Sequence, residues 1–221
     1  MILVLAESAL ELVPNELWRH PAVLADAKRR RKKPGEILLD RSRHHPAMRN
    51  LPDASRRGRP DIVHQVLLVF QYSILNKRGL GRAYVHTRDD YVISLRPETR
   101  VPKNYNNFVS LIEQLYKVGR VPPDGEPLME LHKKDLRQLL EELGGRWVVL
   151  HESGEKLPWQ NLGVVLLNSV VVVGGFPHGD FDNKWVLEKA AARYRIGDEA
   201  MDAPQVVCRA VAVAEAAAGL I

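Results

Sequence analysis

The sequence has a single cysteine, Cys208, among 221 residues, so no disulfide can form within the chain. This excludes the small disulfide-stabilised scaffolds and fits a reducing compartment. The longest apolar run, residues 162–176, contains Asn168 and Ser169 and is shorter than the roughly 20 residues that span a bilayer. Residues 1–7 have no basic stretch before the apolar one, which disfavours a secretory signal. We therefore expect a cytoplasmic protein that is not embedded in a membrane.

Metal and hydrolase signatures are also missing. The eight histidines and the one cysteine show no paired spacing of the kind that holds zinc, so we expect no bound metal. No Gly-x-Ser-x-Gly sequence occurs, which leaves serine hydrolase chemistry without its nucleophile. The pair Gly79 and Gly81 is a fragment of a dinucleotide-binding fingerprint, but Tyr84 replaces its third glycine, and we interpret it as a turn.

Positive charge is concentrated in one segment. Residues 28–59 contain twelve Lys and Arg against three Asp and Glu, a local charge of +9 in a chain whose net charge is +5, so the remainder carries −4. A segregated basic region is typical of a polyanion-binding surface, because phosphate neutralisation supplies affinity that does not depend on sequence. The alternative is a solvated helix end followed by a charged loop. On charge alone we favour nucleic acid as the partner.

Hydrophobic periodicity and turn signals predict alternating strands and helices. Strands are expected at 2–6, 147–150, 164–167 and 169–173, with a hairpin from 83–87 and 91–95. Helices are expected at 16–29, from Pro60 onward, and at 105–118, 133–143, 181–193 and 204–218, with a long connection at 34–59. The short β-branched runs suit strands buried on both faces, so we predict an α/β fold with a parallel sheet in the carboxyl-terminal half. Length favours one domain over 1–221, with a basic insertion segment at about 28–59 and a hairpin-containing insertion at about 83–95.

A glycine-rich turn at 173–180 follows the most apolar of these strands. Gly174 and Gly179 have the spacing of a phosphate loop, yet Asp180 stands where such a loop needs lysine, so a nucleoside triphosphate would meet a negative charge there. Glycines at the carboxyl end of a parallel strand still allow close backbone approach to a flat or uncharged ligand. The alternative is a tight structural turn. The loop at 194–204 is expected to form a second wall of any such site.

Arg59 and Asp61 stand at the predicted start of a helix. Asp61 there complements the helix dipole, which is the usual role of an acid in the first turn. The alternative pairs it with Arg59, whose planar guanidinium would then be held in one orientation toward a phosphate or a base.

Three separated motifs resemble those of a known family. They are Arg-Pro-Asp-Ile-Val-His-Gln at 59–65, Thr-Arg-Val-Pro-Lys at 99–103 before an apolar helix, and Val-Gly-Gly-Phe-Pro-His-Gly at 173–179. In order and spacing they resemble the SPOUT-class ribosomal RNA methyltransferases specific for pseudouridine N1, the Nep/Emg ribosome-biogenesis family. The similarity spans nearly the whole chain, including residues 37–40 and the alanine-rich last helix. The short linking segments look more like the archaeal branch.

The resemblance implies an α/β fold whose carboxyl-terminal part is a deep trefoil knot, a rare exception to the rule against threaded loops. It also implies S-adenosylmethionine as cofactor, small-subunit ribosomal RNA as partner, and a homodimer that builds each site across its interface. Carried over by position, the cofactor contacts are Leu150, Gly174, Gly179, Asp180, Phe181, Ile196, Gly197, Asp198, Glu199, Ala200 and Met201.

The resemblance places RNA contacts at Arg59, Arg100, Lys103 and Asn107, with Arg59 as the catalytic side chain and Asp61 orienting it. The eukaryotic members carry arginine where Lys103 and Asn107 stand here, which removes the bidentate phosphate contact at those two positions.

The implied reaction is in-line transfer of a methyl group from the sulfonium to N1 of a pseudouridine in small-subunit ribosomal RNA. That N–H is weakly acidic, so fixed positive charge from Arg59 would stabilise the anion that forms. Asp61, already paired with arginine, is a poor proton acceptor, which leaves the general base unidentified. The alternative function is a non-catalytic RNA-binding factor that uses the same basic surface during assembly of the small ribosomal subunit.

Overall fold

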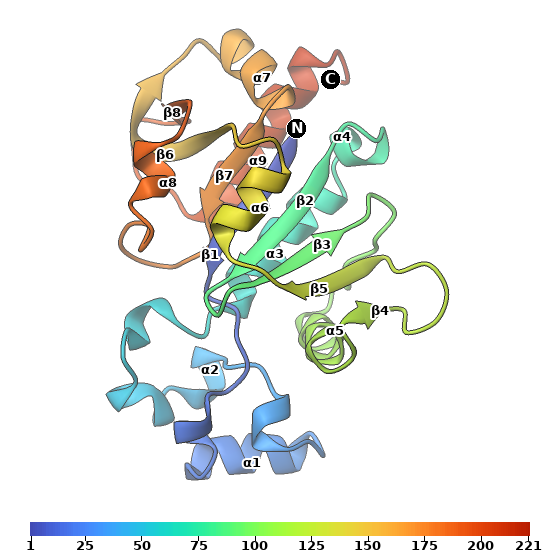
Figure 1. Cartoon of the computed structure of the whole chain (residues 1–221), viewed down its shortest axis with the longest axis vertical. Coiled ribbons are helices and arrows are strands. Elements are labelled where there is room, and N and C mark those ends of the chain that lie inside the picture. The colour runs from blue at the N-terminus through green and yellow to red at the C-terminus, as the bar shows by residue number, and fades with distance from the viewer.

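The protein is built on one mixed sheet of eight strands in the order β4-β5-β3-β2-β1-β7-β6-β8. Our computed structural model describes all residues from 1 to 221. The strands, shown in Figure 1, are β1 (Ile2–Ser8), β2 (Arg82–Thr87), β3 (Tyr91–Leu95), β4 (Arg120–Val121), β5 (Met129–Lys133), β6 (Trp147–Lys156), β7 (Val170–Gly174) and β8 (Ala192–Arg195).

Five neighbouring strands form the parallel part of this sheet. β1 pairs in parallel with β2 and with β7, and β6 pairs in parallel with β7 and with β8. β3, β5 and β4 extend the sheet beyond β2 in antiparallel fashion. The parallel sheet expected for the carboxyl-terminal half is confirmed. Because the strands run the same way, the carboxyl ends of β1, β6 and β7 lie at one edge, where α/β folds bind ligands.

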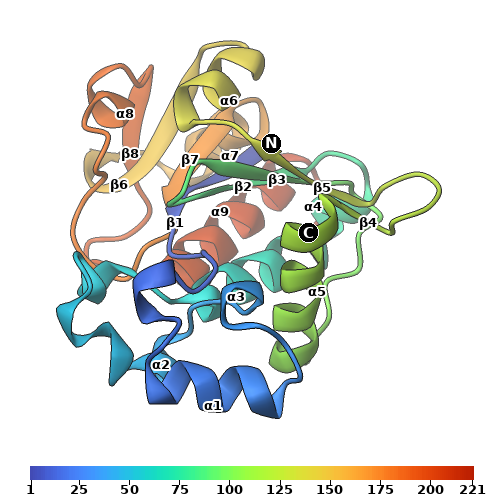
Figure 2. The same ribbon diagram turned by 60° about the horizontal axis from the view of Figure 1, so that its bottom comes forward.

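Helices cover both faces of the sheet (Figure 2). One face carries α3 (Pro60–Gln71), α5 (Tyr105–Val118), α7 (Trp159–Leu167) and α9 (Ala203–Ala217), with α4 (Ile74–Lys77) after α3, and the other carries α6 (Leu136–Glu142) and α8 (Trp185–Glu188). Within β1, Leu3 and Leu5 belong to the first core, whereas Val4 and Ala6 belong to the second. Alternate residues of a strand point to opposite faces, so this central strand is buried on both.

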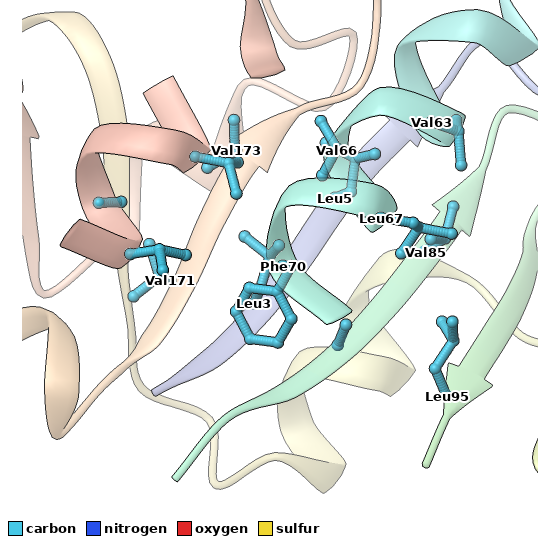
Figure 3. Close-up of a cluster of buried hydrophobic side chains, with 14 of the residues drawn as sticks. Leu3, Leu5, Val63, Val66, Leu67, Phe70, Val85, Leu95, Val171 and Val173 are labelled. Carbon is cyan, nitrogen blue, oxygen red and sulfur yellow. The ribbon is translucent and has the colours of Figure 1, made fainter. Parts of the chain in front are cut away.

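The larger core fixes the position of α3 (Figure 3). Apolar residues recur at helical spacing along α3 and pack against the strands beneath it. The side chains that meet there include Val63, Val66, Leu67, Phe70, Leu3, Leu5, Val85, Val171 and Val173. Burial of each such side chain contributes about 1.5–3 kcal/mol. The start of α3, and Arg59 just before it, is therefore held rigidly against the sheet.

Residues 9–59 form a smaller helical layer at one end of the molecule, below the sheet in Figure 1. It contains α1 (Pro21–Arg29), α2 (Arg41–His44) and the short 3-10 helices η1 (Asn15–Leu17), η2 (Pro34–Glu36), η3 (Ala47–Asn50) and η4 (Ala54–Arg56). Val23, Ile37, Leu39 and Met48 are among the residues of its own apolar core. The connection expected at 34–59 is thus a packed layer, because its apolar residues bury against α1.

Several predicted elements are wrong. Residues 164–167, expected as a strand, end helix α7, because a fully apolar run does not distinguish a buried helix from a strand. The helix expected at 16–29 begins only at Pro21, with His20 as its cap. In place of one helix at 181–193, the chain forms a loop, the short α8 and the start of β8.

The segment before α6 was also misassigned. Strands β4 and β5 were not predicted, and Lys133 ends β5 instead of beginning a helix. Helix α6 starts at Leu136 behind Asp135, whose carboxylate accepts the N–H of Gln138 in a capping box. Polar residues alternate with only two apolar ones in β5, which lies between β3 and the two-residue edge strand β4, and this pattern is too weak to detect from sequence.

The hairpin at 83–95 is confirmed, and its first strand, β2, pairs with β1 inside the main sheet. The trefoil knot and the division of the chain into one domain with insertions stay predictions. No helix combines the length and the apolar character needed to cross a membrane.

Candidate active site

A cavity of about 870 Å³ opens at the carboxyl edge of β6 and β7. Its walls come from the end of β6, the glycine-rich turn after β7 and the loop that leads from β8 into α9. Every residue expected to contact the cofactor lines this cavity except Asp198, whose exposed carboxylate pairs with Lys156 at 2.6 Å. The second wall expected from the loop at 194–204 is confirmed.

Glycines make the turn after β7 sterically feasible. A Cβ atom on Gly174 would lie 2.7 Å from the ring of Phe176, and one on Gly175 would lie 2.4 Å from Oγ of Ser8. Gly179 has a φ of +82°, in the left-handed region that favours glycine. Gly174 and Gly179 therefore lie on this wall of the cavity at positions where a side chain would meet a neighbour or strain the backbone.

The loop that follows the turn is held by Glu7, at the end of β1. The buried carboxylate of Glu7 accepts the N–H groups of Asp182 at 2.7 Å and of Asn183 at 2.9 Å, and also the amide of Asn183. Glu7 itself has a φ of 51°. Sequence reasoning missed this residue; its only signal is a carboxylate at the end of an otherwise apolar strand.

Arg56 links the basic helical layer to the same loop. Its guanidinium lies over the ring of Phe176, 4.6 Å from the centroid, and donates to Asp182 at 2.7 Å. Phe176 in turn fills the space beside Gly174. A side chain that charge alone assigned to an RNA surface therefore supports the cavity wall.

Asp180 places a charged carboxylate at the cavity. Its Oδ1 lies 3.3 Å from Nε2 of His151, and its Oδ2 accepts Nζ of Lys184 at 3.2 Å. Partial burial acts to raise the pKa of Asp180, but the hydrogen bond from the N–H of Phe181 and the pairing with Lys184 outweigh it and hold the pKa below its ordinary value. The cavity therefore presents negative charge to its ligand.

Arg59 and Asp61 form the pair considered from the sequence. Nε and Nη2 of Arg59 each donate to one oxygen of Asp61, both at 2.8 Å, so the contact is bidentate. Donation to this carboxylate raises the pKa of Arg59 above its already high value. Nη1 makes no hydrogen bond within the protein and stays available for a ligand.

A second cavity, of about 620 Å³, adjoins the first. It is lined by Asp40, Arg41, Ser42, His45, Arg59, Asp61, His64, Gln65 and Tyr105. Only Arg59 and Gln65 line both cavities. The Arg59 guanidinium therefore stands where two cavities of different character meet, the first with many apolar lining residues and the second almost entirely polar.

The start of α5 closes one side of the second cavity. The hydroxyl of Tyr105 donates to Asp40 at 2.7 Å, and Nε2 of His64 lies 2.7 Å from the carbonyl oxygen of Pro102. Burial, with the negative charge of Asp40, raises the pKa of Tyr105 well above its ordinary value. The phenol is therefore a fixed donor and is not available as a base.

The three other residues expected to bind RNA line neither cavity. Arg100, Lys103 and Asn107 are exposed on the segment before α5 and in its first turn. Nζ of Lys103 lies 5.5 Å from the ring centroid of Tyr72. This segment contacts α3 at His64 through Pro102 and at Tyr72 through Val101, so it runs along α3 outside both cavities.

Most of the charge in the basic segment is neutralised inside the protein. Seven of its twelve cations form ion pairs with carboxylates: Arg29, Arg30, Lys32, Arg43, Arg56, Arg57 and Arg59. Arg41 donates to two backbone carbonyl groups. The buried carboxylate of Glu113, on α5, accepts both Arg30 and Lys32. The segment therefore carries much less free charge than its composition indicates, and Arg30, Lys32 and Arg56 attach it to the body.

A third cavity, of about 850 Å³, lies at the opposite edge of the sheet, near Met1 and Trp147, and contains no predicted site residue. No group of three or more His, Cys, Asp or Glu side chains is arranged to hold a metal ion.

Comparisons with known proteins agree with this geometry. The family model described as EMG1/NEP1 methyltransferase matches residues 3–215. The chain is 76% identical over the full length of both chains to the ribosomal RNA small subunit methyltransferase Nep1 of Pyrobaculum islandicum. It is 51% identical to the protein of that name from Thermococcus kodakarensis, over 81% of this chain and 83% of the relative.

The fold has a close match among solved structures. The crystal structure of Archaeoglobus fulgidus Nep1 bound to S-adenosylhomocysteine superposes with a TM-score of 0.87 at 38% identity, covering 99% of this chain and 98% of that one. Family model, relatives and fold agree over nearly every residue, and the resemblance noted in the three motifs is confirmed. The chain belongs to the EMG1/NEP1 methyltransferase family.

Proposed function

We propose that the protein transfers a methyl group from S-adenosylmethionine to N1 of a pseudouridine in small-subunit ribosomal RNA. The observation that carries the proposal is the junction of two cavities at Arg59, one suited to the methyl donor and one to a nucleotide. The relatives named as ribosomal RNA small subunit methyltransferases, and the neighbour bound to S-adenosylhomocysteine, support the substrate and the cofactor.

The residues of the first cavity fit S-adenosylmethionine. Leu150, Phe181 and Ile196 offer apolar surface for the adenine ring, and Gly174 and Gly179 allow the backbone of the turn to approach a ligand closely. The carboxylate of Asp180 favours a cationic ligand over a neutral one. When bound, this cofactor supplies an electrophilic methyl group on a positively charged sulfur.

Arg59 acts on the acceptor. As the N1–H proton passes to solvent water, negative charge spreads onto the carbonyl oxygens of the ring, and the free Nη1 of Arg59 lies where the two cavities meet. A fixed cation costs no reorganisation during the reaction and therefore stabilises this charge effectively. Both oxygens of Asp61 are occupied by Arg59, so Asp61 acts through orientation and does not accept the proton.

Arg100, Lys103 and Asn107 hold the RNA around the target, with Arg100 and Lys103 neutralising phosphates. The target base is extruded from the folded RNA to reach the cavities. The family resemblance adds a homodimer and a knotted carboxyl-terminal part within a single SPOUT-type domain over 1–221. The single cysteine and the amino-terminal residues add a cytoplasmic location to the same proposal.

A transfer assay on two matched RNA hairpins tests the proposal, one with uridine and one with pseudouridine at the same loop position, with S-adenosylmethionine labelled on its methyl group. We expect label only in the pseudouridine hairpin. If neither hairpin is labelled although both bind tightly and the cofactor also binds, the protein is a non-catalytic RNA-binding assembly factor and the proposal is wrong.

A further inference from the structure

Arg41 and His45 keep free nitrogen atoms at the second cavity, but several of its other polar side chains are already hydrogen-bonded within the protein. Asp40 accepts the N–H and Oγ of Ser42 as well as the hydroxyl of Tyr105. Both oxygens of Asp61 accept Arg59, and Nε2 of His64 is taken by a backbone carbonyl. These side chains shape the cavity, but their hydrogen-bonding groups are already used.

Gln65 is the exception at the junction of the cavities. It lies one helical turn after Asp61 on α3, its side chain is exposed, and it forms no hydrogen bond within the protein. Its amide offers one acceptor oxygen and a donor NH₂ group side by side. Beside it, the free Nη1 of Arg59 is a donor only.

A uracil-type ring is recognised by a partner that both accepts and donates a hydrogen bond. In this ring N3–H lies between two carbonyl groups, and N1–H lies beside one of them. A base that turns N1 toward the first cavity therefore presents N3–H and a carbonyl group to the second cavity. Arg59 cannot accept N3–H, because guanidinium has no acceptor. Of the two residues shared by the cavities, only Gln65 can accept this proton while donating to the carbonyl.

We propose that the second cavity receives the acceptor nucleotide and that Gln65 holds its base by the N3–H and the adjacent carbonyl, which directs N1 toward the cofactor cavity. The cavity volume of about 620 Å³ lies within the range of sites that enclose small ligands. With N3 held in a hydrogen bond, N1 is the imide nitrogen left to react. This inference rests on the proposed function and identifies the residue that reads the base.

The test combines two enzymes with two substrates. Single-turnover methyl transfer is measured for the natural protein and for Gln65→Ala, on one hairpin with pseudouridine and one with N3-methylpseudouridine, which lacks the N3–H. We expect the natural protein to lose about tenfold in rate on the N3-methylated hairpin, because the methyl group removes the N3–H hydrogen bond and pushes the flanking carbonyl away from the Gln65 amide. Gln65→Ala should show a similar loss on pseudouridine and no further loss on the N3-methylated base.

Gln114→Ala is the matched control, because Gln114 is an exposed glutamine on α5 that forms no hydrogen bond and lines none of the three cavities. It should keep the natural rates on both hairpins, and all variants should melt at the same temperature. The inference is overturned if Gln65→Ala is as fast as the natural protein, or if it discriminates between the hairpins as strongly. If the natural protein fails on the pseudouridine hairpin, it is the proposed function that fails instead.

Discussion

Arg59 and Asp61 form a bidentate ion pair in which Nε and Nη2 of the guanidinium each meet one carboxylate oxygen at 2.8 Å. The pair fixes the plane of the guanidinium and leaves Nη1 directed to neither oxygen. Because Pro60 and the packed helix α3 hold the backbone between the two residues, the orientation of Arg59 is set by the fold. A small charged group is thus held at one point between two cavities.

Removal of Arg59 should slow the chemical step more than it weakens binding. We expect Arg59→Ala to lower kcat by about 10²–10³-fold, the cost of removing one preorganised charge-stabilising group. Asp61→Asn keeps Arg59 but leaves its guanidinium free to turn, so a smaller loss, of about tenfold, is expected. Both side chains are more than a third exposed, so the melting temperature should change little. If Arg59→Ala has the same kcat as the natural protein, this role of Arg59 is contradicted.

A bulky side chain at Gly174 should abolish cofactor binding and spare RNA binding. In Gly174→Val the new side chain extends into the space occupied by Phe176, at the wall of the first cavity. Isothermal titration with S-adenosylmethionine should show a loss of at least tenfold in affinity, and hairpin affinity should stay within about twofold. A parallel loss of both would show that the two sites are not separable.

Arg100→Ala should weaken the binding of RNA whatever the RNA sequence. Because Arg100 is exposed and lines neither cavity, its contact is with phosphate, and the slope of log affinity against log salt should shrink by about 0.7–0.9. Arg137→Ala, on α6 at the other face of the sheet, changes the net charge equally and serves as the control. Equal effects of both variants would indicate that only net charge matters.

Acidification should destabilise the fold through its buried histidines. Burial lowers the pKa of His44 and of His86 below 6.5, although Asp26 acts to raise the first and Asp90 the second. Below pH 6.5 the unfolded chain binds protons that the folded chain excludes, so stability is complete above this value and declines as the pH falls toward the folded-state pKa. The melting temperature should fall between about pH 7 and pH 5.

His44→Asn should flatten that decline, because it keeps an acceptor for the N–H of Asp40 while removing the titrating ring. The exposed His132→Asn should leave the slope unchanged. If the melting temperature of His44→Asn falls with pH as steeply as that of the natural protein, His44 does not contribute to the loss of stability in acid.

The sequence predicted the parallel sheet and the walls of the first cavity because both depend on local patterns. A β-branched run such as Val170–Val173 and the glycines that follow it are visible without a structure. The Arg59–Asp61 pair was considered for the same reason, since its members are two residues apart. The sequence did not reveal contacts between segments that are distant along the chain. In two of these contacts, Glu7 binds the loop at 182–183 and Arg56 lies over Phe176.

The basic segment shows the limit of composition most clearly. Its arginines indicated a nucleic-acid surface, but carboxylates from elsewhere, such as Glu11 and Glu113, pair with several of them. Charge counted along a sequence does not reveal which cations are already neutralised. The second cavity escaped sequence reasoning in the same way, because Asp40, His64 and Tyr105 come from three separate segments.

The proposed reaction delivers the methyl group to N1 of pseudouridine. To locate the methyl group, the labelled hairpin is digested to nucleosides, which are identified by mass spectrometry against synthetic standards. We expect all of the label in N1-methylpseudouridine. Label on N3, on a ribose 2′-oxygen or on another nucleotide would contradict the placement of the acceptor beside Arg59 and Gln65.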